Sequence, residues 1–328
     1  MSPTRIVLTG ATGFVGSHVL RGLAAAHETD PGITVRALAR TAPESRPAPG
    51  VTWTPADLTD PASLRGVMSG ADVLVHLASR ISGDEAQCAA VNVEGTTALV
   101  DEAVRCGVGR VVHLSTTAVY GAGPHRGIAV NEITPAPVSA ASRTRLLGET
   151  PALAAGGIVL RPGLVLGAGD RWVVPALAEL LDRVPARWDG GRGLLSLVDV
   201  NDLARLITTL ATTPHAPASG IYHASHPEPV NNGELMAQLA ALDVLPPTED
   251  DWPWEKCLHH LHRTPGTISE RQFSLLAQDH WYDANTIWHT LPCPEGPGPV
   301  SRLTEAAPWY RTFLRESRRR HDGRPVRA

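Results

Sequence analysis

Short apolar runs alternate with amphipathic segments along the first half of the chain. The apolar runs are rich in β-branched residues, have the length of buried strands, and occupy residues 5–9, 34–40, 51–58, 71–79, 110–116 and 157–167. The segments between them, of which 14–26 is the clearest, carry apolar residues at the three- and four-residue spacing of a helix. Strands that alternate with helices predict βαβ units, and therefore an α/β fold whose parallel sheet is covered by helices on both faces.

The regular alternation stops near residue 162, and the sequence beyond it is rich in proline, tryptophan and histidine. Two later segments, 194–211 and 219–225, have the periodicity of elements that return to the sheet. A chain of 328 residues is long enough for two unequal lobes. We therefore predict a doubly wound domain over 1–161 plus 194–225, a smaller mixed C-terminal lobe over 162–193 plus 226–315, and a disordered tail over 316–328.

The composition of the chain argues against two classes of binding partner, nucleic acids and membranes. The net charge of −4 argues against a surface built for nucleic-acid phosphates, and no apolar run is long enough to span a bilayer. The chain enters its first strand without the apolar stretch of a signal peptide, and its four cysteines are far apart with no CxxC pair. We expect a cytoplasmic monomer or homodimer with reduced thiols that binds neither nucleic acid nor membrane.

The first strand is followed by a turn in which glycine recurs every third residue, at Gly10, Gly13 and Gly16. A tight turn between a strand and a helix requires residues without Cβ, and it lets the backbone approach a pyrophosphate. The helix N-terminus then offers unpaired N–H groups to the phosphates. This pattern predicts a Rossmann domain that binds a dinucleotide through Gly10, Thr12, Gly13, Phe14, Val15 and Gly16.

The GxxGxxG spacing resembles that of the extended short-chain dehydrogenases/reductases, which include the NAD-dependent epimerase/dehydratase-like proteins. Further segments between residue 4 and about residue 235 resemble motifs of this family in the same order: Asp57-Leu58, HLAS at 76–79, VNVEGT at 91–96, STTAVYG at 115–121, LRPG at 160–163 and VDVND at 198–202. The resemblance implies that the cofactor also contacts Asp57, Leu58, Leu77, Ala78, Ser79, Asn92, Pro162 and Gly163.

The end of the second strand indicates which nicotinamide cofactor is bound. Members of the family that prefer NAD usually carry an acidic residue there, which hydrogen-bonds the ribose hydroxyls. This chain has Arg36 and Arg40 instead, with no Asp or Glu before Glu44. A guanidinium suits the 2′-phosphate of NADP, so we predict that Arg36 and Arg40 select NADPH; the alternative is that both are solvated surface charges.

The resemblance breaks down at the acid–base pair, because the family's reductases use Ser or Thr with Tyr and Lys spaced YxxxK on one helix. The expected segment, PxSxYxxSKxxxE, here reads PVSAASRTRLLGE over 137–149, and YxxxK occurs nowhere in the chain. We align Ser139 with the tyrosine and Arg143 with the lysine. Arg143 is then expected to hold the ribose hydroxyls. Thr116 and Ser139 are the candidate catalytic residues, with Thr116 donating a hydrogen bond to a carbonyl oxygen.

Other side chains do not replace the missing proton donor convincingly. A serine is a far weaker acid than a phenol beside a cation, and an arginine does not release its proton. His113 is expected to be a core residue, Tyr120 to be structural as in the relatives, and Tyr222 stays open as a donor. A further cluster has a spacing that matches no standard metal site, so we predict no metal there: Cys257, His259, His260 and His262.

The intact cofactor motifs and the missing acid favour an NADPH-dependent ketoreductase. Its expected substrate is a polycyclic aromatic polyketide of the angucyclinone type, whose acidic phenol beside the carbonyl supplies the proton. Seven of the eight tryptophans lie beyond residue 161 and either fill the core or wall a cleft for such a ring system. The arginine-rich composition fits an actinomycete enzyme of antibiotic biosynthesis. Two alternatives stay open: a non-catalytic NADP(H) sensor, and a nucleotide-sugar epimerase or dehydratase.

Overall fold

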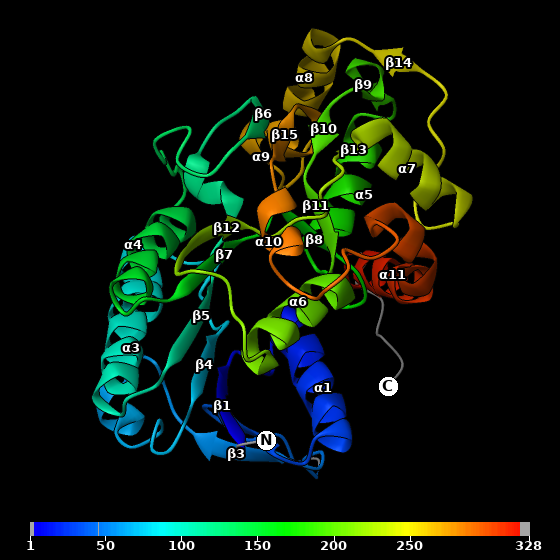
Figure 1. The fold of residues 1–328 in the computed structure, drawn as a ribbon. Helices are drawn as coiled ribbons and strands as arrows, with labels where there is room; N and C mark the ends of the chain where they lie inside the picture. The colour runs from blue at the N-terminus through cyan, green and yellow to red at the C-terminus, as the bar shows by residue number, and fades with distance from the viewer. Residues whose placement is uncertain (1–2, 45, 322–328) are drawn as a thin grey trace.

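A seven-stranded parallel sheet forms the centre of the computed structural model, which describes residues 3–44 and 46–321 (Figure 1). The strand order is β3-β2-β1-β4-β5-β7-β12, in which the connection reverses direction between β1 and β4. The strands are β1 (Thr4–Thr9), β2 (Ile33–Ala39), β3 (Val51–Pro55), β4 (Val73–His76), β5 (Arg110–Leu114), β7 (Ile158–Arg161) and β12 (Gly220–His223). The predicted α/β Rossmann fold is therefore confirmed.

Helices cover both faces of this sheet, as the alternation along each strand requires. Ile6 and Leu8 of β1 pack against a first group of helices, whereas Val7 between them packs on the other face. The first group consists of α1 (Phe14–Thr29), α6 (Val200–Thr212) and the short α10 (Asn285–His289). The opposite face is covered by α3 (Thr96–Arg105) and α4 (Ala140–Ala154), which lie side by side in Figure 1.

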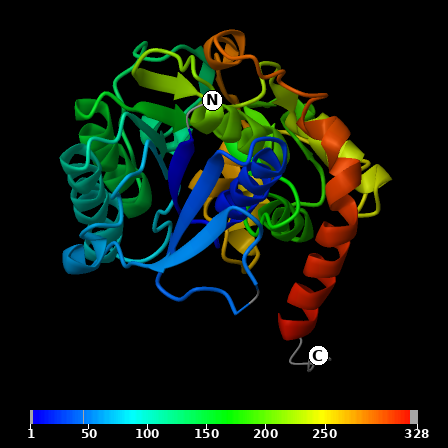
Figure 2. The same ribbon diagram turned by 60° about the horizontal axis from the view of Figure 1, so that its bottom comes forward.

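The second lobe is built around a small mixed sheet in the order β13-β10-β15-β6. Its strands are β6 (His125–Ile128), β10 (Leu194–Leu195), β13 (Val230–Asn231) and β15 (His280–Tyr282), and two strand pairs flank it: β8 (Leu164–Leu166) with β11 (Leu197–Asp199), and β9 (Arg187–Trp188) with β14 (Asp251–Trp252). The lobe has its own apolar core. Its helices are α5 (Val173–Arg183), α7 (Asn232–Ala241), α8 (Trp254–Arg263), α9 (Glu270–Ala277) and α11 (Pro299–His321), the last of which runs along one flank in Figure 2.

The lobes do not divide at the predicted boundaries. β6 lies inside the segment 1–161 yet belongs to the small sheet, and α10 comes from the segment 226–315 yet packs on the large sheet. The segment 61–70, predicted as a helix, forms only a 3₁₀ turn at Pro61–Leu64, because Gly66 and Gly70 both have positive φ. The predicted tail begins inside α11, which continues to His321, and residues 322–328 lie outside the described part of the chain.

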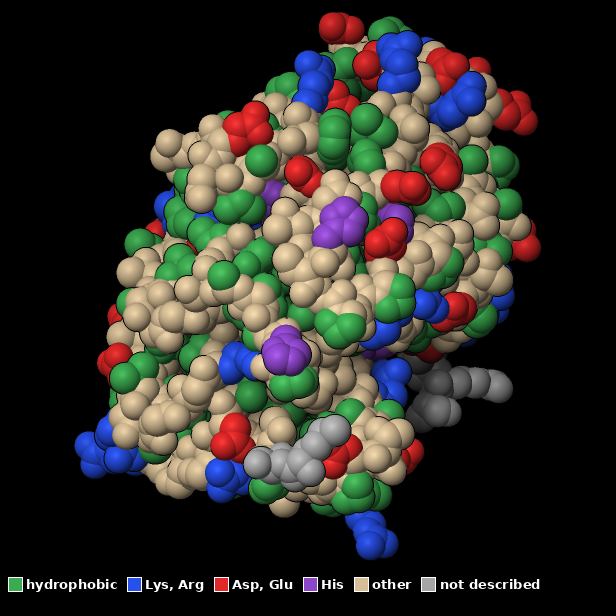
Figure 3. Space-filling model, viewed as in Figure 1, with side chains coloured by type: hydrophobic (Ala, Val, Ile, Leu, Met, Phe, Trp, Pro, Cys, Tyr) green, Lys and Arg blue, Asp and Glu red, His purple; other side chains and the backbone are tan. Residues whose placement is uncertain are grey.

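The surface carries charges of both signs. On the face seen in Figure 3, acidic and basic side chains are interspersed and gather at the end of the molecule where Figure 1 places α8 and β14. In the described residues, no helix is both long and apolar enough to cross a membrane.

Candidate active site

A cavity of about 760 Å³ opens at the carboxyl ends of the central strands, around the point between β1 and β4 where the strand order reverses. Open α/β sheets bind their ligands at this place. Most of the predicted cofactor-binding residues line the cavity: Gly10, Thr12, Gly13, Phe14, Val15, Gly16, Arg40, Asp57, Leu58, Leu77, Ala78, Ser79, Pro162 and Gly163. Arg36, Asn92 and Arg143 do not line it.

The turn between β1 and α1 forms a cradle for a diphosphate. Gly10 has φ +72°, and a Cβ on it would lie 2.7 Å from the backbone nitrogen of Ala78. Gly13 precedes the 16-residue α1 and provides no side-chain cap, so the first N–H groups of this helix are left for a ligand. The close backbone approach and the uncapped helix end fit a dinucleotide's phosphates.

The adenosine end of the cavity is lined by Arg40, Asp57 and Leu58. Two hydrogen bonds from Thr59, one from its backbone N–H and one from its hydroxyl, lower the pKa of the Asp57 carboxyl below its ordinary value. Asp57 is thus a fixed carboxylate that can accept a hydrogen bond from an adenine amine. Arg40 follows the end of β2 and is exposed beside it.

Arg36 does not line the cavity, so the structure gives no support to its predicted contact with the cofactor. Its guanidinium donates to the carbonyl oxygens of Val67 (2.6 Å) and Ser69 (3.2 Å). Arg36 lies in the middle of β2, four residues before Arg40, which corresponds to roughly 13 Å along an extended strand. Its side chain therefore braces the loop after the 3₁₀ turn and leaves Arg40 as the cation at the adenosine end.

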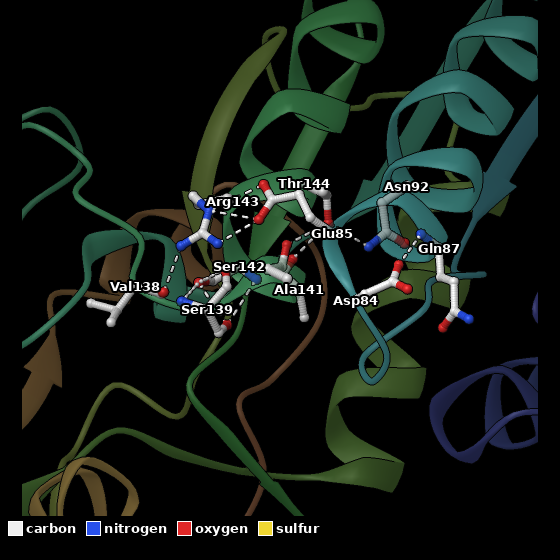
Figure 4. A network of polar contacts seen from close by, with 11 residues as sticks. Asp84, Glu85, Gln87, Asn92, Val138, Ser139, Ala141, Ser142, Arg143 and Thr144 are labelled. Carbon is white, nitrogen blue, oxygen red and sulfur yellow. Dashed lines mark hydrogen bonds and ion pairs between the residues drawn. The ribbon is translucent and has the colours of Figure 1, made fainter.

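Asn92 does not line the cavity either, so the structure gives no support to its predicted contact with the cofactor. It sits in a π-helical turn, Ala90–Gly95, and its side chain is buried. The amide oxygen accepts from the N–H of Arg80 (2.7 Å), and the amide nitrogen donates to the carbonyl oxygen of Arg80 (2.8 Å) and to the hydroxyl of Thr144 (2.9 Å). Asn92 therefore positions the cavity-lining loop after β4 against α4 (Figure 4).

Ser139 is the N-cap of α4 and does not line the cavity, so the structure gives no support to its predicted catalytic role. Its hydroxyl accepts from the N–H of Ser142, whose hydroxyl accepts in turn from the N–H of Ser139. This reciprocal capping box fixes where the helix begins (Figure 4).

Arg143 does not line the cavity, so the structure gives no support to its predicted contact with the ribose. Its guanidinium pairs with Glu85 at the surface and donates to the carbonyl oxygen of Val138 (2.6 Å), as Figure 4 shows. Both side chains of the pair stay about half exposed. A different arginine of α4 lines the cavity.

That cation is Arg145, which lines the cavity beside Ser115 and Thr116. In the motif YxxSKxxxE the lysine precedes the glutamate by four residues, so counting back from Glu149 places Arg145 at the lysine and Ala141 at the tyrosine. Our alignment of Ser139 and Arg143 was therefore two residues out of register. Arg145 donates to the carbonyl oxygens of Leu114 (3.1 Å) and Ser115 (2.6 Å). Burial lowers the pKa of its guanidinium to about 10, which leaves it a cation at neutral pH.

Thr116 follows β5 and lines the same corner of the cavity as Pro162 and Gly163. Its hydroxyl oxygen accepts from the N–H of Ala118 at 3.2 Å, which leaves its own hydrogen free to be donated. Thr116 can therefore hydrogen-bond a substrate oxygen, but its hydroxyl is too weak an acid to replace a tyrosine.

A buried ion pair supports this corner from behind. Arg161 and Glu149 pair at 2.6 Å with both side chains only 3% exposed, and Glu149 also accepts from the hydroxyl of Ser115. Arg161 donates further to the hydroxyl of Tyr120 (2.9 Å), which lies 2.7 Å from Nε2 of His223. The chain of contacts joins the end of β5 to β7 and β12, and the burial of Tyr120 within it agrees with the structural role predicted for this residue.

The remaining candidate donors are not in the cavity. His113 is buried beneath α4 beside His76, and burial holds the pKa of its imidazole well below the ordinary value, in agreement with the predicted core role. The hydroxyl of Tyr222 donates to the carbonyl oxygen of Ala218, away from the cavity lining. Within residues 3–44 and 46–321, no three His, Cys, Asp or Glu side chains form a metal-binding group.

The tryptophans do not wall the cavity. Trp188 and Trp288 are buried in the two cores, and four others pack against the core of the second lobe: Trp172, Trp252, Trp254 and Trp309. Of the two alternatives that the sequence left open, the structure supports core packing.

The fold and the cavity define this chain as a dinucleotide-binding protein of the Rossmann class. The profile of the NAD dependent epimerase/dehydratase family matches residues 6–224. The chain belongs to that family, whose NAD(P) cofactor fits the cavity described above.

Two relatives are about equally similar in sequence. One is the 2-alkyl-3-oxoalkanoate reductase of Stenotrophomonas maltophilia (strain K279a), which is 30% identical over 72% of this chain and 75% of its own. The other is the 4-hydroxy-2-methyl-3-oxo-4-farnesyl-3,4-dihydroquinoline-1-oxide ketoreductase of Stigmatella aurantiaca, 30% identical over 73% and 72%.

Solved structures share the fold at lower identity. MoeE5 in complex with UDP-glucose and NAD has a TM-score of 0.70 and 21% identity, covering 94% of this chain and 99% of its own. The dTDP-glucose 4,6-dehydratase of Streptomyces venezuelae, with NAD and TYD bound, has a TM-score of 0.71 and 22% identity, with 94% and 97% covered. At these identities the likeness shows the fold alone.

Proposed function

We propose that the protein is an NADPH-dependent ketoreductase that reduces a carbonyl of a polycyclic aromatic polyketide of the angucyclinone type. One observation carries the proposal: Thr116 and Arg145 keep the oxygen-binding half of the family's site, whereas Ala141 stands where the tyrosine acid belongs. A substrate that brings its own acidic hydroxyl needs only this half. A phenol beside the carbonyl is such a hydroxyl.

The chain's own residues then position the carbonyl and stabilise charge on its oxygen. A bound NADPH would supply the hydride for the carbonyl carbon. Thr116 donates a hydrogen bond to the carbonyl oxygen, and the partly buried cation Arg145 favours the negative charge that develops in this corner. Neither side chain delivers a proton, so the carbonyl oxygen takes it from the neighbouring phenol.

The relatives support a reductase over an epimerase. The two described above are named as a reductase and a ketoreductase, and the substrate of the second contains a quinoline ring system. Reversible oxidation and reduction of a sugar alcohol needs a base. Ala141 occupies the position of the tyrosine that would provide it. The absence of the acid favours one other candidate, a non-catalytic NADP(H) sensor.

The ketoreductase and the non-catalytic sensor differ in whether they consume NADPH. The purified protein is mixed with NADPH and a polycyclic hydroxyketone, and the loss of NADPH absorbance is followed together with the alcohol product. A ketoreductase consumes one NADPH for each alcohol formed. Tight binding of NADPH without product, over a set of such ketones, would replace the ketoreductase by the sensor.

Arg40 is expected to decide the cofactor. Its guanidinium can pair with the 2′-phosphate that NADPH carries and NADH lacks, and a charge-assisted hydrogen bond is worth about 1.5–3 kcal/mol. Arg40→Ala is therefore expected to weaken NADPH binding by roughly 10- to 100-fold and to leave NADH binding unchanged. Fluorescence titration measures both, with Arg36→Ala as the matched control. Equal losses for both nucleotides, or a larger loss in the Arg36 variant, contradict this assignment.

A further inference from the structure

Arg145 is a partly buried cation without a carboxylate within ion-pair distance. No ion pair in the described part of the chain includes it, although fourteen pairs are formed there. The charge of Glu149, one turn along the helix, acts to raise the pKa of Arg145, but the carboxylate oxygens of Glu149 are occupied by Arg161 and the hydroxyl of Ser115. A buried charge is costly unless something compensates it, so an unpaired guanidinium that lines a cavity indicates a site for an anion.

The guanidinium of Arg145 is held in a fixed orientation, and some of its N–H groups have no hydrogen-bond partner. Nη2 makes both of the hydrogen bonds to the backbone, with the carbonyl oxygens of Leu114 and Ser115. Nε is buried without a partner. Nη1 makes no hydrogen bond to the described residues and is not among the buried atoms. The backbone contacts therefore aim the side chain, and Nη1 is the N–H group available to a ligand.

The position of Arg145 in the cavity indicates that the anion belongs to the substrate. The phosphate cradle at Gly10–Gly16 and the cation Arg40 serve the other parts of the cavity. Arg145 lies instead with Leu114, Ser115 and Thr116, at the carboxyl end of β5. A tyrosine at position 141 would present a hydroxyl from the same face of α4, one turn before Arg145, but Ala141 presents only a methyl group.

We propose that Arg145 contacts the substrate's phenolic oxygen and stabilises the phenolate that remains once this hydroxyl has given up its proton, so that the substrate's own hydroxyl can act as the acid. This rests on the proposed ketoreductase function and names the residue that completes it. The carbonyl carbon gains the hydride, the carbonyl oxygen takes the phenol's proton, and the phenol oxygen keeps the electron pair of the broken O–H bond. Arg145 stabilises the resulting phenolate, which regains a proton from water when the product leaves.

A binding experiment without turnover tests this role. The protein is saturated with NADP⁺ and mixed with a hydroxyanthraquinone whose hydroxyl is adjacent to a carbonyl, since ionisation of such a phenol shifts its visible absorption. A titration with pH then gives the pKa of the phenol in the complex. We expect the wild-type complex to lower it by at least about one pH unit relative to the free probe, as a nearby cation does. Arg145→Gln is expected to abolish the decrease and Arg145→Lys to keep part of it.

The matched control is Arg143→Gln, which removes an arginine from the same helix outside the cavity and is expected to leave the bound phenol's pKa as in the wild type. NADP⁺ affinity is measured for every variant. The same bound pKa in Arg145→Gln as in the wild type overturns the proposal, as does failure of the wild-type complex to bind the probe. A loss confined to NADP⁺ affinity also overturns it, because Arg145 would then serve the ribose. A pKa decrease that depends on Arg145 without any NADPH consumption supports the anion site and refutes the reductase.

Discussion

Methylating the phenol beside the reacting carbonyl is expected to lower kcat/KM under NADPH by at least about 100-fold, the lower end of what a general acid contributes. The reason is the composition of the cavity corner. Thr116 and Arg145 can bind an oxygen but not protonate it, and Ala141 has replaced the tyrosine. Without the phenol, hydride addition would leave an alkoxide in a partly dry site, at a large cost in free energy.

The measurement compares a polycyclic hydroxyketone with its O-methyl ether. An ether at a remote ring position is the control, because it adds the same methyl group and leaves the acid in place. Binding of each compound to the NADP⁺ complex separates poor binding from a slow chemical step. Comparable kcat/KM values for the phenol and its adjacent ether would rule out substrate assistance and require a donor from the protein.

Replacing Glu149 by glutamine is expected to lower the free energy of unfolding by about 3–5 kcal/mol, because removal of one partner of a buried ion pair leaves the other charge uncompensated. Arg161 is only 3% exposed and has no other acidic partner within the described residues. The substitution also weakens the hydrogen bond that Glu149 accepts from Ser115. Urea unfolding measures the change.

Glu85→Gln is the matched control for this experiment. It breaks the pair with Arg143, which contains the same residue types and lies on the surface. Exposed pairs contribute about 0–1 kcal/mol, so this variant is expected to unfold almost as the wild type does. Similar losses in the two variants would contradict the distinction between a buried and an exposed pair.

The strands and the cofactor turn were predictable because their signals are local. An apolar run bounded by a glycine turn records both the burial of a strand and the need for a residue without Cβ, so β1, α1 and the cradle at Gly10 were found. The type of a residue does not show how far its side chain lies from the carboxyl end of the strand. Arg36 and Arg40 were therefore given the same role, although only Arg40 reaches the cavity.

The alignment of α4 with the family's motif was harder to predict, because this segment lacks the tyrosine that normally fixes the alignment. We aligned Ser139 with the tyrosine instead, and in the structure Ser139 forms the capping box of the helix with Ser142. The residue that settles the register is Glu149, whose contact with Arg161 connects two separate elements. The signal was present in the motif, since counting back four residues from Glu149 gives Arg145.

The pairing of β6 with β15 has a consequence for how the chain folds. His125 of β6 and Tyr282 of β15 are hydrogen-bonded across 157 positions of sequence, and the last strand of the large sheet, β12, also comes late in the chain. Such non-local pairing raises the contact order and slows folding. During synthesis, an emerging N-terminal half cannot complete either sheet, so the edge of β7 stays exposed until β12 has been made and the edge of β6 until β15 has been made. A fragment that ends at residue 161 is expected to aggregate, even though it contains the entire dinucleotide cradle.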